Sequence, residues 1–148
     1  MGEAYGCAII NVTPMAKIHA GFSELRASHH RLIAAARTGV GPPAHLLLFY
    51  AVECGLKYVH LRRNNLTTTE KLGDLDHDLS FLIKNLKLSR SAIGDAPALR
   101  LSRGENEHCP PSSAHQAWRY GVRIEETDEA KFVTWLKRIC EVVVREYL

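Results

Sequence analysis

Three polar residues share one face of an otherwise apolar segment near the middle of the chain. Within residues 44–61, Glu53, Lys57 and His60 stand at positions i, i+4 and i+7. In a helix this spacing puts all three on one narrow stripe. The lysine could meet a phosphate group and the glutamate could orient it, although a Glu–Lys pair at this spacing also stabilises a helix by about 0.2–0.5 kcal/mol. The stripe is therefore the first candidate site.

The segment that carries the stripe, Pro42–Arg63, is predicted to be the central helix of the fold. Its sequence is apolar over most of a helical circumference, which is typical of a helix that other elements surround. The two prolines at its start suit the first turn of a helix, and the basic residues at its end suit the last turn.

Apolar residues at helical spacing predict three more main helices. The first runs from the Thr13–Pro14 cap to Thr38, the next covers about His77–Leu88 behind an Asp76 cap, and the last runs from Thr127 to the C-terminus. Short helical pieces are expected in 89–111 and at 112–118. Apart from a possible short strand at 8–12 in the irregular lead-in 1–12, no strand is indicated. We therefore expect an all-α bundle of four main helices, as a single domain over residues 1–148.

Composition limits the class of protein without naming a function. The 148 residues are 46% hydrophobic and 24% charged, which is ordinary for a globular domain, and the net charge of +3 permits a nucleic-acid partner without requiring one. The longest apolar run, Leu46–Val52, is too short to cross a bilayer, so we expect a cytoplasmic protein with no membrane partner.

Four scattered cysteines favour reduced thiols over disulfides. They are Cys7, Cys54, Cys109 and Cys140, and none forms a C-x-x-C pair. The spacing of His108, Cys109 and His115 matches no closed zinc site, so no metal is expected.

Three motifs, in order, resemble those of one helical family. Residues 51–61 (AVECGLKYVHL), 76–86 (DHDLSFLIKNL) and 115–124 (HQAWRYGVRI) resemble the "A-x-E-x-x-L-K-x-x-L", "H-D-L-x-x-L" and "A-R-Y-P" segments of HEPN domains. The resemblance covers about residues 40–148. It implies a helical bundle that commonly dimerises and that is often encoded beside a nucleotidyltransferase or within toxin–antitoxin and phage-defence cassettes. We expect no cofactor.

The resemblance also implies a possible catalytic pair. Many HEPN members are metal-independent ribonucleases with an R-x(4–6)-H motif, and Arg103 and His108 have four residues between them. A histidine can move the 2′-hydroxyl proton while an arginine holds the scissile phosphate. This pair, however, stands among Gly104 and the prolines 110 and 111 rather than at the start of a long helix. The alternative is two loop residues whose spacing is accidental.

Two adjacent pairs complete the candidate residues. His77 and Asp78 stand at a helix start, where they could cap the helix or help to form a polar pocket with the Glu53–Lys57 stripe. Arg119 could bind a phosphate or a carboxylate that Tyr120 covers, or the segment could simply pack its aromatic residues onto the bundle.

Three functions remain open at this stage. The motif context at Arg103 favours a non-catalytic module that binds RNA or a nucleotide, or that assembles with a partner protein, through the region of Lys57, His77 and Arg119. The alternatives are a dimeric HEPN endoribonuclease that uses Arg103 and His108, and a helical adaptor that binds a larger protein.

Overall fold

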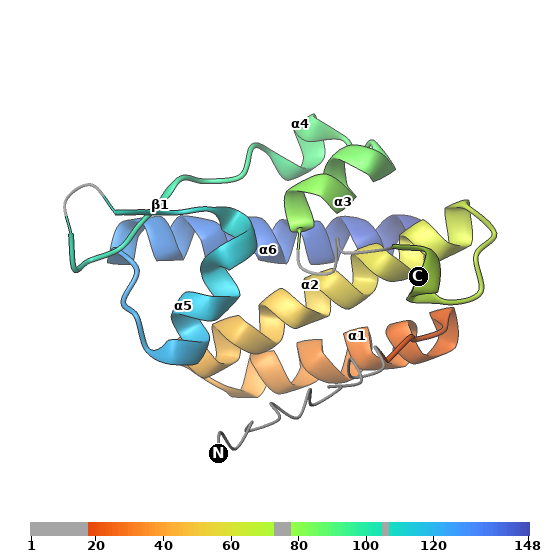
Figure 1. Cartoon of the computed structure of the whole chain (residues 1–148), viewed down its shortest axis with the longest axis horizontal. Helices are drawn as coiled ribbons and strands as arrows, with labels where there is room; N and C mark the ends of the chain where they lie inside the picture. Colours follow the sequence, from red (N-terminus) through yellow and green to blue (C-terminus); the bar gives the residue numbers. More distant parts are fainter. Residues whose placement is uncertain (1–17, 73–77, 105–106) are drawn as a thin grey trace, which may run out of the picture.

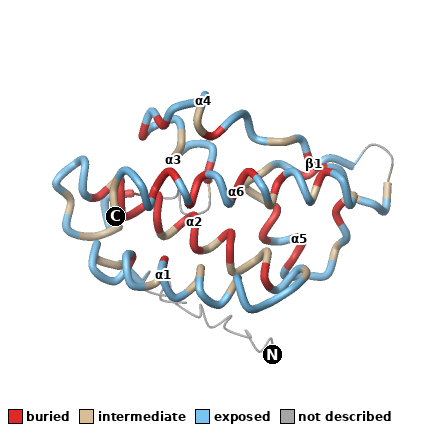
Figure 2. Tube along the Cα trace, turned by 180° about the vertical axis from the view of Figure 1, so that it is seen from behind, coloured by how far each residue is buried: buried red, intermediate tan, exposed pale blue. Residues whose placement is uncertain are grey.

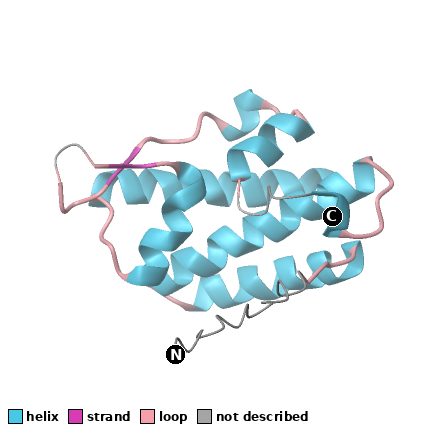
Figure 3. Cartoon of the chain, viewed as in Figure 1, coloured by secondary structure: helices cyan, strands magenta, loops and turns pink. Residues whose placement is uncertain are grey.

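The chain is mostly helical in a computed structural model that describes residues 18–72, 78–104 and 107–148, in agreement with the expected all-α class (Figure 3). The α-helices of these residues are α1 (Phe22–Thr38), α2 (Gly41–Arg63), α3 (Leu79–Leu86), α4 (Arg90–Ile93), α5 (Ala114–Tyr120) and α6 (Glu126–Tyr147). Two short 3-10 helices, η1 (Thr69–Leu72) and η2 (Pro111–Ser113), join them. No helix in these ranges is long and apolar enough to cross a membrane.

Helix α2 lies at the centre of the fold, as its apolar circumference predicts. Helices α1, α3, α5 and α6 all pack against it (Figure 1). Figure 2 shows buried residues concentrated along α2 and on the inner side of α6, whereas most of α1 is exposed. The largest fully buried side chains of the core include Phe49 and Leu56 from α2 and Phe132 from α6.

A glycine allows three helices to meet closely in this core. A Cβ atom at Gly55 of α2 would lie 2.8 Å from Nδ1 of His29 in α1 and 3.2 Å from a methyl group of Val143 in α6. The His29 ring is fully buried, and its Nδ1 lies 2.7 Å from the carbonyl oxygen of Ala51. Since a carbonyl only accepts, Nδ1 is the donor of this hydrogen bond.

The first helix starts later than predicted. Residues Thr13 and Pro14 lie outside the described residues, but residues 18–21 are not helical and α1 begins at Phe22. Gly21 forms an antiparallel bridge with Thr68, and the backbone of Ala20 bonds with Thr69 at 2.9 and 3.0 Å. The Glu24 carboxylate accepts the N–H of Gly21 at 2.7 Å. These contacts hold the segment extended and cap the helix at Gly21, which corrects the expected boundary.

One of two later caps agrees with its prediction and the other differs. Asp78 caps α3, as one predicted role for it had it, because its side chain accepts the N–H of Phe81 at 3.0 Å. The other predicted cap, Asp76, and the possible strand at 8–12 lie outside the described residues. Glu125, rather than Thr127, caps α6 by accepting the N–H groups of Thr127 and Asp128. A longer carboxylate side chain can reach the same first-turn N–H groups from an earlier position.

A short β-hairpin stands where only helical pieces and loops were predicted. Strands β1 (Leu99–Arg100) and β2 (His108–Cys109) pair antiparallel, with Leu99 opposite Cys109 and Arg100 opposite His108. Leu99 and Cys109 are buried, while Arg100 and His108 face solvent. Strands of two residues are too short to show an alternating pattern in the sequence, so the expectation of no strand here was wrong.

The cysteines in the described residues are free thiols, as predicted. They are Cys54, Cys109 and Cys140, and Cys7 lies outside these residues. Burial raises the pKa of Cys54 to about 11 and that of Cys140 to about 12. Both thiols therefore stay protonated near neutral pH, which makes them poor nucleophiles.

Buried histidine makes the stability of the fold depend on pH. Burial lowers the pKa of His29, only partly offset by the hydrogen bond to Ala51, so the unfolded chain takes up a proton at a higher pH than the folded chain. The stability is therefore full above the ordinary histidine pKa of about 6.5 and falls as the pH drops below it. Urea unfolding should give a lower free energy of unfolding at pH 5.0 than at pH 7.5.

The variant His29→Asn separates this effect from other titrations. The asparagine amide can still donate to the Ala51 carbonyl but does not titrate. The free energy of unfolding of the variant should change less between the two pH values than that of the parent. Some pH dependence should remain, because burial also lowers the pKa of His45 and His60. If the free energy of unfolding changes equally with pH in the parent and the variant, His29 does not contribute to the pH dependence of stability.

Candidate functional site

A small groove lies between the β1–β2 hairpin and α5, and three of the predicted site residues, Arg103, His108 and Tyr120, line it together. Its volume is about 280 Å³. We call it the hairpin groove and define it by its lining residues, which are Leu101, Arg103, His108, Cys109, Pro110, Ser113, Gln116, Ala117, Tyr120 and Val122. Figure 1 shows the hairpin and α5 side by side, next to the start of α6.

The hairpin side of the groove is held by the first turn of α6. The Asp128 carboxylate accepts the backbone N–H of Arg100 at 3.1 Å and its Nε–H at 2.9 Å. Asp128 is buried, and its hydrogen bonds with Arg100 lower the pKa of the carboxyl group. Backbone bonds from Glu125 to Arg100 (2.8 Å) and from Ser102 to Arg123 (2.9 Å) pin the hairpin to the segment before α6. These contacts join strand β1 of the hairpin to the start of α6.

The α5 side is held by an aromatic anchor. Trp118 is buried, donates its indole N–H to Glu129 of α6 at 2.9 Å, and lies 5.8 Å from the Phe132 ring between centroids. Gly121 then ends the helix with a φ of +73°, a left-handed conformation that glycine adopts at little cost. The turn leaves Tyr120 at the rim of the groove, with 71% of its surface exposed.

Arg103 and His108 both come from the hairpin. Nε of Arg103 lies 2.7 Å from a carboxylate oxygen of Glu107, and both side chains are largely exposed. The terminal nitrogens of this arginine make no hydrogen bond with any residue in the described ranges. They can therefore donate to a phosphate while Glu107 holds the other edge of the guanidinium group.

Arg119 lies beside the groove, next to Tyr120. Its guanidinium carbon lies 5.9 Å from the centre of the Tyr120 ring, and the group also donates to the Tyr50 hydroxyl of α2. The predicted neighbours Arg119 and Tyr120 thus interact with each other, and both are exposed.

The Glu53–Lys57 stripe lies elsewhere, in the interior. The two side chains form an ion pair of 2.6 Å and are 8% and 11% exposed, respectively, and neither lines the hairpin groove. Asp78 caps α3 with its side chain, and His77 lies outside the described residues. The structure therefore brings Arg103, His108 and Tyr120 together and keeps Lys57 apart from them.

Sequence reasoning missed two polar residues of this groove. Ser113 and Gln116 come from η2 and the first turn of α5 and line it opposite the hairpin. Neither belongs to a recognisable motif, and only the i, i+3 and i+7 spacing from Ser113 through Gln116 to Tyr120 could have placed the three on one helical face.

No known protein family, curated protein or solved structure matches this chain. The HEPN family stays a prediction from the three sequence motifs. The hairpin groove combines the hydrogen-bond donors of Arg103, the exposed aromatic ring of Tyr120 and the imidazole of His108.

Proposed function

We propose that the chain is an RNA- or nucleotide-binding module that holds single-stranded RNA in the hairpin groove. The observation that carries the proposal is that Arg103, His108 and Tyr120, from two separate elements, line one groove. The arginine can hold a phosphate through paired donors, and a base can stack on the exposed tyrosine ring. Unpaired bases and ribose 2′-hydroxyls are the features by which proteins commonly recognise RNA, and Ser113 and Gln116 can bond to them.

The size of the groove supports one nucleotide unit as the recognised group. Its volume of about 280 Å³ is just below the 300–1,000 Å³ typical of small-molecule sites, so only a small group can be enclosed in it. Arg119, exposed beside Tyr120, supplies a further positive charge for a neighbouring phosphate of the same strand.

The resemblance to HEPN domains supports a wider setting for the same proposal. It suggests a component of a microbial defence or toxin–antitoxin system that acts as a homodimer or with a cognate partner, such as a nucleotidyltransferase. Sedimentation of the purified chain at tens of micromolar, alone and with the product of a neighbouring gene, checks this part. A monomer that binds no such partner counts against it.

Binding of a fluorescein-labelled eight-nucleotide RNA, followed by fluorescence polarisation at a stated salt concentration, tests the proposal. Tyr120→Ala should weaken binding by about 1–3 kcal/mol, roughly 5- to 150-fold, because one stacked base is lost. Arg103→Ala should also weaken binding and should reduce the slope of log K against log salt by about 0.7, because one phosphate contact is lost.

The matched control is Arg90→Ala. This arginine is exposed on α4 and pairs with Asp95 at 2.5 Å, and it does not line the groove. Its removal should leave the affinity almost unchanged. If all three variants bind RNA as the parent does, or if the parent binds no RNA, the proposed function is wrong.

Ribonuclease activity is a second candidate, because Arg103 and His108 line the same groove. If the chain cuts RNA, cleavage should persist in EDTA, since acid–base work by histidine needs no metal. The variant His108→Ala should then lower the cleavage rate by roughly 10²–10⁴-fold. A binding module shows no cleavage in the parent or in any variant, so gel analysis of the same RNA decides between the two.

A further inference from the structure

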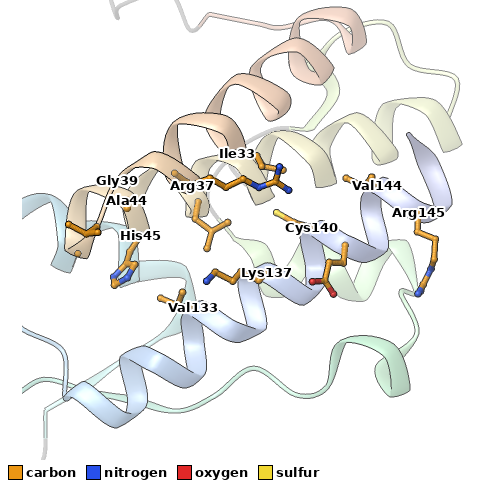
Figure 4. Close-up of a pocket in the computed structure, with 15 residues that line it drawn as sticks. Ile33, Arg37, Gly39, Ala44, His45, Val133, Lys137, Cys140, Val144 and Arg145 are labelled. Atoms are coloured by element: carbon orange, nitrogen blue, oxygen red, sulfur yellow. The ribbon is translucent and has the colours of Figure 1, made fainter.

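A larger groove opens where the end of α1 and the start of α2 face α6 (Figure 4). Its volume is about 780 Å³, and it shares no lining residue with the hairpin groove. We call it the α1–α6 groove. Its lining residues are Ile33, Ala36, Arg37, Gly39, Val40, Gly41, Ala44, His45, Leu48, Val133, Lys137, Cys140, Glu141, Val144 and Arg145.

The floor of this groove is apolar and continuous along α6. Ala44, Leu48 and Cys140 are buried in it, while Val144 is 44% exposed and Val40 is 88% exposed. Helices α1 and α6 both pack on α2, and the groove is the open corner between them. From Val133 to Arg145 it follows α6 for about 18 Å, slightly more than three turns of helix.

Charged side chains follow the rim in a regular order. Lys137, Glu141 and Arg145 stand at i, i+4 and i+8 on α6, which gives the order positive, negative, positive along one side. Arg37 lies on the opposite side, and Figure 4 shows Arg37 and Lys137 extending over the groove from its two sides. Within the described residues the only ion pair of these four side chains is an exposed contact of 3.6 Å between Arg145 and Glu146. The rim therefore has a net positive charge that is available to a ligand.

The shape and charge of the groove favour a helix over its other possible occupants. The volume of about 780 Å³ also lies within the 300–1,000 Å³ typical of small-molecule sites, so a small amphiphile is the alternative occupant that the experiment has to distinguish. A second copy on a two-fold axis would bring the same net positive rim against itself, which is unfavourable. An amphipathic helix can cover the apolar floor with one face and meet both rims with its flanks, as in other helix-in-groove complexes.

We propose that the α1–α6 groove docks one amphipathic helix of a partner protein, with an acidic, a basic and an acidic side chain at four-residue spacing opposite Lys137, Glu141 and Arg145. The same order of charges on the partner sets its register along α6, as flanking charges do in coiled coils. Arg37 on the other rim favours a further acidic residue on the opposite flank of the helix. The site is independent of RNA binding in the hairpin groove.

Two synthetic 18-residue peptides with the same leucine stripe test this proposal. One carries Glu, Lys and Glu at four-residue spacing on its flank and the other carries Lys, Glu and Lys. By fluorescence anisotropy the parent chain should bind the first peptide about 10-fold more tightly than the second. The triple variant Lys137→Glu, Glu141→Lys, Arg145→Glu should reverse this preference, because all three charges on the α6 rim change sign.

One single variant tests the apolar floor of the groove, and a second serves as a control outside the groove. Val144→Glu should weaken the binding of both peptides by about 10-fold or more, since a charged side chain then lies on the apolar floor of the groove. Arg138→Glu makes the same change of charge as Lys137→Glu, at a residue of the same helix that does not line the groove, and it should keep the parent's preference. Far-UV melting curves confirm that each variant is folded. If the triple variant does not fold, Lys137→Glu alone should still reduce the preference for the first peptide.

Any of five results would overturn the proposal. The first two are that the parent binds neither peptide or that it binds both equally. The triple variant keeps the parent's preference. Sodium oleate binds in the groove while the peptides do not, which identifies a small amphiphile as the ligand. Sedimentation shows a dimer of the parent that Val144→Glu dissociates, which identifies a second copy as the occupant.

Discussion

Replacing Leu56 with alanine is expected to lower the free energy of unfolding by about 2–5 kcal/mol. Leu56 is fully buried in α2, inside the core that α2 shares with α6. Removing three carbon atoms there loses their transfer energy and leaves a cavity that the surrounding helices fill only in part. Urea unfolding followed by far-UV circular dichroism measures the change, provided that the free energy of unfolding depends on urea concentration with the same slope in parent and variant.

Two control variants show whether the loss comes from the core. Leu56→Met keeps most of the volume and should cost less than about 1.5 kcal/mol. Val40→Ala removes apolar atoms from a position that is 88% exposed and should change stability by no more than about 0.5 kcal/mol. A loss for Leu56→Ala no larger than that for Val40→Ala would contradict the central position of α2.

Replacing Gly55 with valine is expected to lower the free energy of unfolding by about 1–3 kcal/mol or more. Even the Cβ atom would lie 2.8 Å from His29 and 3.2 Å from Val143, and the two additional methyl groups need still more space. Helix propensity alone predicts the opposite sign, because glycine is among the weakest helix formers. Destabilisation in the same urea assay would therefore measure the close approach of α1, α2 and α6.

A double-mutant cycle attributes this effect to the contact itself. Gly55→Ala should destabilise the parent, but it should cost less, or even stabilise, in a His29→Ala background where the ring no longer occupies the space. Residues in contact usually show coupling of 0.5–3 kcal/mol in such a cycle. Additive effects of the two changes would mean that Gly55 and His29 do not crowd each other.

Two parts of the fold follow from the sequence by itself. Helix α2 occupies Gly41–Arg63, within one residue of the predicted Pro42 start, and α6 starts one residue before the predicted Thr127 and runs almost to the C-terminus. Both segments are long and carry many apolar residues at helical spacing, so a few residues that do not fit the spacing leave the prediction of a helix unchanged. Their caps were less predictable, since Glu125 and Thr127 can each serve the first turn of α6.

The candidate sites were decided by tertiary structure. The sequence indicates that Arg103 and His108 could do chemistry, but Tyr120 joins them only because Asp128 holds the hairpin and Trp118 holds α5 against the same end of α6. Likewise, the helical spacing of Glu53 and Lys57 shows that they share a face, while the packing around α2 determines that this face is buried. Periodicity reports which residues of one element lie together, whereas contacts between elements depend on how whole surfaces pack, and no local pattern encodes that.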